Sequence, residues 1–505
     1  MKKANMAKSE AVAGHASPAL IKKKSSFAGD VLKLTGGTTL AQALTILVAP
    51  ILSRLYAPDA FGTAAVFASI IGIIGVVACL RYELAIMLPE RDEDAANLLA
   101  VSLGFVLVIT GLSTILILFA GGPILGLLNA PDLKPYLWLV PLATLVNGGL
   151  LALKYWNLRT KQFGRLSVAC VTSSVVGTGT KLGAGFAGRA TGGSLISAGV
   201  IGSIVATLVL GGQIWQDDRC TFIKSIRLPR MFEWAKRHRK FPIFNTWSAL
   251  LNTASWQLPA FLLAVFFSPA EVGYYAVGNR VVQLPMNLIG SAIAQVFFQR
   301  ASEARNVDGD LADVVTPLFR RLVAFGFFPM LLLMVIGQDV FIVVLGQRWS
   351  EAGVYMQILS LWMFVRFISS PLSTLFSVLE RQEGALLLNT LIFTTRLIAL
   401  GTGGMLGNAR LALVLFAATG ILVYGGLCAW ILKTSGVSKS QAWSILFKYL
   451  SISVLIISPV AAAKLLAPAS SFIVLAGGAV ACGIYGFILL LHEESNFIER
   501  FRRLV

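Results

Sequence analysis

The sequence APDAFGTAAV at residues 57–66 returns as SPAEVGYYAV at residues 268–277, an offset of 211 positions. Pro, Gly, Ala and Val occupy matching places in the two stretches. A polar stripe with the spacing of one helix face also precedes each stretch. Its members are Thr35, Thr38, Gln42 and Thr45 in the first copy, and Asn245, Ser248, Asn252 and Ser255 in the second. We therefore predict two similar halves.

The composition around these repeats is that of a membrane protein. Of the 505 residues, 56% are apolar and only 13% are charged, against about 25% charged in soluble domains. Because a helix needs about 20 residues to cross the hydrocarbon, and a lone strand cannot satisfy its backbone there, we expect an all-α integral membrane protein with about fourteen transmembrane helices. The expected spans are 28–53, 60–80, 97–119, 136–156, 166–186, 193–215, 243–267, 272–298, 317–337, 352–378, 385–405, 410–432, 444–466 and 470–491.

Six spans separate the two repeat copies, so both halves have the same orientation. Parallel repeats are related by an axis along the membrane normal and place a binding site between them. We predict two pseudo-symmetric six-helix bundles around a central cavity, plus two C-terminal helices. The predicted segments are a basic tail (1–27), a first bundle (28–215), a basic linker (216–242), a second bundle (243–432), two additional helices (433–491) and a C-terminal tail (492–505).

Lys and Arg are distributed unevenly between the two sides of this arrangement. With the N-terminus inside, the inner segments hold 28 of these cations and the outer loops hold 5. This asymmetry indicates that both termini are cytoplasmic. The Lys-rich N-terminus is expected to be a retained tail, because the apolar run after it is too long for a signal-peptide core.

Five cations fall inside predicted spans, whereas the carboxylates fall in loops or at span ends. These cations are Lys33, Lys181, Arg280, Arg366 and Arg396. Each costs about 2.5 to 3.5 kcal/mol to insert at mid-span. Such residues suit a cavity whose ligand is negatively charged. We predict that they bind this ligand and that the polar stripes (Thr35, Thr38, Gln42, Asn245, Ser248 and Asn252) line the same cavity. The alternative for each cation is snorkelling to an interface.

The remaining charged segments and the Cys and His residues give no specific indication of a catalytic or metal site. The linker cations at 217–241 alternate with Phe232 and Trp234, a pattern that can bind RNA but, beside a membrane, favours anionic headgroups. The mixed charges at 81–94 are typical of a solvated face, with an ion-paired inner gate as the alternative. Five scattered Cys and three His predict no metal site and no cofactor.

The run LSRLYAPDAFGTAAVFASIIGIIGVVACLRYELAIMLPERDED at residues 52–94 resembles the N-terminal signature of the polysaccharide exporter family. These are Wzx-type O-antigen and capsule-repeat flippases, in a superfamily that includes lipid II flippases and multidrug carriers. The resemblance implies alternating access, coupled to an ion gradient, that flips an undecaprenyl-diphosphate-linked oligosaccharide. The first span has no carboxylate of the kind used by proton-coupled multidrug carriers, so the coupling ion stays open.

The prediction is therefore a non-enzymatic flippase of the bacterial inner membrane, without a nucleic-acid partner. A multidrug exporter of the same superfamily is the first alternative, although cavity cations would repel cationic drugs. A membrane glycan polymerase or ligase is the second; it would need a large outer loop with catalytic polar groups. Binding of glycan-assembly proteins by the linker is a third.

Overall fold

The computed structural model describes residues 27–283, 286, 291–306, 311–466 and 470–502, and every regular element in them is a helix. Thirteen of these helices exceed 20 residues or come close to it. They are α1 (Phe27–Leu55), α2 (Pro58–Val77), α4 (Asp92–Leu127), α5 (Leu139–Arg159), α6 (Phe163–Phe186), α7 (Gly192–Ser225), α9 (Thr246–Phe266), α12 (Leu311–Leu345), α13 (Ser350–Leu372), α15 (Gln382–Met405), α16 (Ala409–Thr434), α17 (Lys439–Leu466) and α18 (Ser471–Arg502). The shorter elements are α3 (Tyr82–Ala85), η1 (Pro131–Tyr136), α8 (Leu228–Arg237), η2 (Phe241–Asn245), α10 (Pro269–Val282), α11 (Ser291–Asn306), η4 (Gln347–Trp349) and α14 (Leu375–Val378).

The all-helical membrane fold is confirmed, but the count of fourteen spans is not. Twelve helices in the described part of the chain are long and apolar enough to cross a membrane. The predicted span 166–186 forms α6, which has the length but is not among those twelve; its many Gly, Ser and Thr residues lower its hydropathy. The predicted span 272–298 is divided between α10 and α11. The sequence between them contains Pro285, a residue type that interrupts helical hydrogen bonding.

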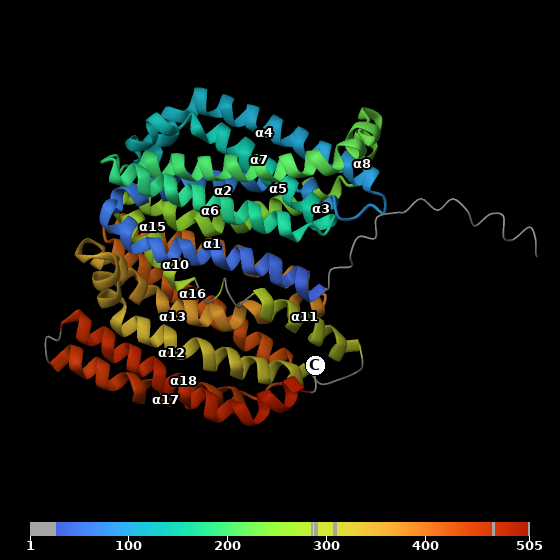
Figure 1. Ribbon diagram of the computed structural model, residues 1–505. Coiled ribbons are helices and arrows are strands. Elements are labelled where there is room, and N and C mark those ends of the chain that lie inside the picture. The colour runs from blue at the N-terminus through green and yellow to red at the C-terminus, as the bar shows by residue number, and fades with distance from the viewer. Residues whose placement is uncertain (1–26, 284–285, 287–290, 307–310, 467–469, 503–505) are drawn as a thin grey trace, which may run out of the picture.

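The helices pack in two groups. In the first, α1 packs on α6, α6 on α7, and α5 on both α4 and α7. In the second, α13 packs on α10, α12 and α16, and α15 on α9 and α16. Figure 1 shows α4, α5 and α7 of the first group in the upper part of the view and α12, α13 and α16 of the second group below them. The exact limits of the two halves stay a prediction.

The two groups meet most closely at the N-terminal ends of α2 and α10, where the repeated sequences lie. The charge distribution predicts that this end of the molecule is the outer one, and we call it the outer end. A Cβ on Gly62 would stand 1.7 Å from the carbonyl oxygen of Pro269, and one on Gly273 would stand 2.1 Å from that of Pro58. The two contacts are reciprocal, as an axis between the halves requires. Only glycine permits this backbone approach.

Further contacts at the same end hold the two groups together. The Ser53 hydroxyl donates to the carbonyl oxygen of Leu345, and the Trp349 indole donates to the carbonyl oxygen of Ser53, both at 2.9 Å. Nearer mid-depth, the Ser69 hydroxyl on α2 lies 3.0 Å from Oε1 of Gln257 on α9. The junction is therefore closed at this end of the molecule.

Helices α17 and α18 form a hairpin against α12, at the lower edge of Figure 1. Lys464 on α17 donates to Asp339 on α12 at 2.6 Å, and Ser471 on α18 donates to the other oxygen of the same carboxylate at 2.9 Å. The Tyr485 hydroxyl adds a buried bond to the carbonyl oxygen of Ala324. One paired carboxylate thus fastens both additional helices.

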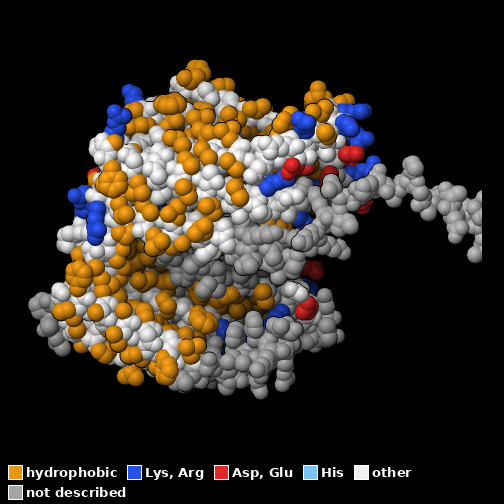
Figure 2. Space-filling view, viewed as in Figure 1, with side chains coloured by type: hydrophobic (Ala, Val, Ile, Leu, Met, Phe, Trp, Pro, Cys, Tyr) orange, Lys and Arg blue, Asp and Glu red, His pale blue; other side chains and the backbone are white. Residues whose placement is uncertain are grey.

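The surface agrees with a membrane environment. Figure 2 shows an apolar band across the middle of the visible face, with Lys and Arg side chains gathered toward the two ends of the helices. Large apolar side chains such as Leu118, Phe119 and Leu422 are exposed within spans. In water such a band would drive aggregation, whereas lipid chains cover it without cost.

Candidate functional site

Two of the predicted cations, Arg366 on α13 and Arg396 on α15, meet at one aromatic ring. The guanidinium carbon of Arg366 lies 3.9 Å from the ring centroid of Trp256 on α9, and that of Arg396 lies 4.5 Å from it. Trp362 lies slightly farther from both, at 5.9 Å and 5.8 Å. The electron-rich faces of these rings attract cations. Both guanidinium groups therefore make cation–π contacts with the indole of Trp256.

Arg396 is the more deeply held of the pair, with 3% of its surface exposed. Its Nη1 donates to the carbonyl oxygen of Ser255 at 2.9 Å and to the Ser255 hydroxyl at 3.1 Å. Its Nη2 is buried and has no hydrogen-bond partner. Tyr424 on α16 interacts with both guanidinium groups. Nη2 of Arg396 is therefore a buried donor that can take a ligand as its hydrogen-bond partner.

Carboxylates are missing from this cluster. The ion pairs formed by the described residues involve other cations, such as Arg159, Arg165 and Arg230, and none involves Arg366 or Arg396. Two like charges near one ring repel each other, and the low dielectric of the interior strengthens that repulsion. A bound anion would relieve it.

The other predicted cations lie apart from this pair. Lys181 is on α6 in the first helix group and is half-buried, whereas Arg280 is on α10 in the second group and is exposed. The charge of Arg280 acts on Lys181, so these two side chains lie within electrostatic range of each other although they belong to different groups. The structure brings together two pairs of cations rather than one cluster. The side chain of Lys33 lies outside the described residues.

The polar stripe of α9 leads toward the arginines. Asn245, Ser248 and Asn252 are exposed, and they share a helix face with Trp256. Ser255, the last member of the stripe, is buried and accepts the hydrogen bonds of Arg396. The sequence pattern placed Ser255 on this face but gave it no role.

The corresponding stripe of α1 has less structure around it. Gln42 is exposed and Thr38 is half-buried. Thr45 donates to the carbonyl oxygen of Ala41 within its own helix. The Thr35 side chain lies outside the described residues. No aromatic residue on α1 takes the place that Trp256 has on α9.

Trp256 is the central residue that sequence reasoning missed. It follows Ser255 and continues the polar face of α9, so its position was available as a signal. A lone Trp in an apolar helix is usually a packing residue, however. Only the convergence of α13 and α15 on it gives it a different role.

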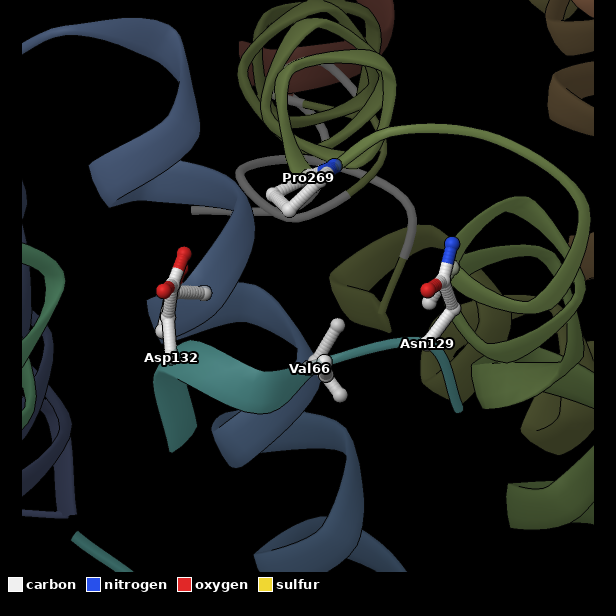
Figure 3. Close-up of a pocket in the computed structure, with 7 residues that line it drawn as sticks. Val66, Asn129, Asp132 and Pro269 are labelled. Atoms are coloured by element: carbon white, nitrogen blue, oxygen red, sulfur yellow. The ribbon is translucent and has the colours of Figure 1, made fainter. Parts of the chain in front are cut away.

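A recess at the outer junction is separate from these cations. Figure 3 shows Asn129 and Asp132 beside Val66 of α2 and Pro269 of α10. Thr63, Ala130 and Ala264 complete its lining. Its single charged residue is acidic, so it does not suit an anion.

The first residues of the predicted basic linker continue α7 to Ser225, and the helix α8 follows at the end of the first group that lies opposite the junction of α2 and α10 (Figure 1). Its inner face is fixed by Trp234, whose indole donates to Asp94 at 3.1 Å, and by Arg230, which pairs with the same carboxylate. Leu228 and Phe232 are exposed together with the remaining cations. Apolar and cationic groups side by side suit the headgroup region of an anionic leaflet.

No group of three His, Cys, Asp or Glu residues that could hold a metal ion occurs among the described residues. The side chains that converge at Trp256 are cationic and aromatic.

The sequence profile of a family described as "Polysaccharide biosynthesis protein" matches residues 51–354, more than half of the chain. No curated protein sequence matches. Among solved structures, "Lipid II flippase MurJ, inward closed conformation" is similar with a TM-score of 0.69 and 13% identity, covering 92% of this chain and 99% of that one. An inward-facing multidrug resistance MATE transporter of the MOP superfamily follows, with a TM-score of 0.62, 15% identity, and coverage of 81% and 98%.

A third structure is a MOP superfamily transporter from Pyrococcus furiosus, whose report describes reverse polarity of its binding pocket. Its TM-score is 0.51 at 14% identity, covering 81% of this chain and 96% of that one. At such identities these likenesses show that the chain shares the fold of these proteins. The substrate has to be argued from the residues of this chain.

Proposed function

Because the chain belongs to the polysaccharide biosynthesis protein family, we propose that it flips a polyprenyl-diphosphate-linked oligosaccharide from the inner to the outer leaflet of the bacterial inner membrane. The cargo would be an O-antigen, capsule or exopolysaccharide repeat unit, and both termini would be cytoplasmic. The observation that carries the proposal is the pair Arg366 and Arg396 at Trp256, without a carboxylate partner.

A diphosphate matches this pair chemically. Guanidinium groups bind phosphate oxygens through two parallel hydrogen bonds. The unpartnered Nη2 of Arg396 and the half-buried Arg366 supply donors. Trp256 holds both groups near one position, so less side-chain entropy is lost on binding.

The sugar part of the substrate needs a polar path. The exposed amides and hydroxyl of Asn245, Ser248 and Asn252 run along α9 from its inner end toward Trp256, and they can hydrogen-bond to sugar hydroxyls. After leaving Arg366 and Arg396, the diphosphate would contact Lys181 and Arg280 between the two helix groups. The polyprenyl tail would remain in lipid.

Alternating access requires the closed outer junction to open. The reciprocal contacts of Gly62 and Gly273 make this junction tight in the present structure, so an anion reaching Arg366 would enter from the inner side. Rocking of one group against the other would separate α2 from α10. The substrate would then leave on the outer side.

The alternatives fit the observations less well. A multidrug exporter of the same fold would have to place cationic drugs beside two unpaired arginines, which repel them. A glycan polymerase or ligase would need catalytic groups in a large outer loop, and the longest outer loop expected from the sequence has about fifteen residues. We therefore propose a transporter rather than an enzyme.

The test is binding of undecaprenyl diphosphate to the purified full-length protein, compared with undecaprenol, which lacks the anion. Each charge-assisted hydrogen bond is worth about 1.5 to 3 kcal/mol, so Arg366→Ala should weaken binding of the diphosphate at least about tenfold. Arg366→Lys should recover part of it. Binding of undecaprenol should be unchanged.

Arg410→Ala is the matched control, because Arg410 is an exposed arginine already paired with Glu351 at the outer end. It should leave binding unaltered. Equal binding of the diphosphate by Arg366→Ala and the unsubstituted protein, or equal binding of diphosphate and alcohol, would refute the assignment. Normal surface-glycan assembly by Arg366→Ala and Arg396→Ala cells would do the same.

A further inference from the structure

A second unusual charge lies at the inner end of the first helix group. Glu83 on α3 belongs to the mixed-charge segment for which the sequence indicates a solvated face, yet only 1% of its side chain is exposed. Its neighbours Tyr82, Ala85 and Ile86 are also buried. For Glu83 the solvated-face prediction is wrong, because the short α3 folds back against α4 and α5.

The partners of this carboxyl group are incomplete. Its Oε1 lies 3.5 Å from Nη1 of Arg81, at the outer limit of hydrogen-bond distance. Its Oε2 is buried and has no hydrogen-bond partner, and Nε of Arg81 is equally unpartnered. A fully ionised carboxylate would need several close donors to offset its lost hydration.

The backbone holds the group in this position. Leu80 and Arg81 have positive φ values of 47° and 63°, which non-glycine residues adopt rarely. Arg159 on α5 fastens the following residues by donating to the carbonyl oxygens of Ile86 and Glu90. The turn is therefore built to keep Glu83 inside rather than to release it to water.

The other titratable groups around Glu83 do not replace the missing donors. The Cys79 thiol donates to the carbonyl oxygen of Gly148. Tyr155 on α5 is close enough for its ionisation to depend on Glu83. On α4, Asp94 is occupied by Trp234 and Arg230. Burial raises the pKa of Glu83 above its usual range, and the backbone N–H of Glu83 itself and the guanidinium of Arg81 offset this only in part.

We propose that Glu83 is a proton-binding site of this protein, neutral in the arrangement seen here and ionised when the segment rearranges. One proton from water binds the carboxylate oxygen. The ligand is thus a proton, and its site is the interior of the turn between α2 and α4.

The segment that carries Glu83 contacts the linker between the two helix groups. The hydroxyl of Tyr82, next to Glu83, donates to the carbonyl oxygen of Ala235 on α8, and α3 also contacts η2. Helix α8 and η2 form the link between the two helix groups. Ionisation of Glu83 would therefore be transmitted to the linker, where Glu233, Lys236 and His238 are close to Ala235 in sequence.

The direction of the pH effect follows from the raised pKa. The buried arrangement prefers the protonated group, so it is favoured at low pH and loses stability as pH rises through the pKa of Glu83. Substitution by glutamine keeps the shape and the neutral form. The Glu83→Gln protein should therefore keep the low-pH arrangement at every pH.

The experiment is infrared spectroscopy of the full-length protein, following the C=O stretching band of protonated carboxyl groups during a pH titration. The difference between the unsubstituted protein and Glu83→Gln should contain one carboxyl group that titrates well above the ordinary value of about 4.3. Glu90→Gln, a change at an exposed carboxylate of the same segment, should remove no such band. His238 does not contribute to this band.

Arg81→Gln provides a second test if Glu83→Gln does not fold. Loss of the guanidinium should move the same band to higher pH. The proposal would be overturned if the difference spectrum lacked this band. It would also be overturned if the band titrated near the ordinary carboxyl pKa in both the unsubstituted protein and Arg81→Gln. These measurements need no glycan.

A role for this proton as the coupling ion rests on the proposed function. In that case transport by the unsubstituted protein should depend on a pH gradient, and Glu83→Gln should remove this dependence while binding of undecaprenyl diphosphate is retained. Loss of diphosphate binding in Arg366→Ala together with a normal Glu83 band would separate the two proposals.

Discussion

The two helix groups are alike at their outer ends and unlike at mid-depth. At the outer ends, Gly62 and Gly273 each meet the carbonyl oxygen of a proline from the other group. At mid-depth, α9 carries Trp256 between Arg366 and Arg396, whereas α1 has Ile46 at the equivalent position. The symmetric part can serve a movement that involves both groups equally. The asymmetric part can recognise a charge.

The largest effect should come from breaking the symmetric contact. A methyl group at Gly62 would lie 1.7 Å from the Pro269 oxygen, so Gly62→Ala should hold the outer junction apart and abolish transport. Spin labels at the outer ends of α2 and α10, in a cysteine-free background, should report a longer distance. Gly273→Ala should act in the same way.

Gly75→Ala is the matched control for that change, because Gly75 lies on the same helix with open space around its Cβ position. It should leave both transport and the label distance unaltered. An unchanged distance in Gly62→Ala would mean that the close contact does not set the conformation.

A second change should remove the asymmetry without disturbing the symmetric contact. Ser255→Asp would put a carboxylate beside Nη1 of Arg396, where the hydroxyl now lies at 3.1 Å. The internal ion pair should compete with the ligand, so binding of undecaprenyl diphosphate should fall about tenfold or more while the thermal midpoint is maintained. Ser255→Asn adds no charge and should bind within a few-fold of normal. Tight binding by Ser255→Asp would contradict the cationic site.

A smaller loss is expected when the ring between the arginines is changed. Cation–π contacts contribute about 0.5 to 2 kcal/mol each, so Trp256→Leu should weaken diphosphate binding several-fold and Trp256→Phe should weaken it less. Trp247→Leu, on the exposed side of the same helix, is the control. Calorimetric titration with undecaprenyl diphosphate would rank the three variants, and equal affinities would exclude a role for the ring.

Much of the fold could be predicted because hydropathy acts locally. Each span is recognised from about 20 neighbouring residues, and the inner excess of Lys and Arg favours one orientation. The count failed where local averages mislead. Helix α6 has too many small polar residues to meet the hydropathy criterion, and α10 and α11 share what looked like one span.

For the candidate site, the sequence could predict only how deep each residue lies in the membrane. Counting along a helix places Arg366 and Arg396 far from either membrane surface, and their unpaired charge follows from the distribution of carboxylates in the sequence. The same counting grouped them with Arg280 and Lys181, which the structure places elsewhere. It also left Glu83 in a solvated segment, because nothing local distinguishes a turn that folds inward.

The sequence by itself determined that this chain is helical, spans a membrane, repeats itself and carries cations at depth, since composition and periodicity are properties of consecutive residues. Only the tertiary structure decided that α9, α13 and α15 converge on Trp256, that Gly62 and Gly273 face each other's prolines, and that Glu83 is enclosed. The rotation of a helix about its axis is set by packing against helices far away in sequence. That rotation decides which side chains meet.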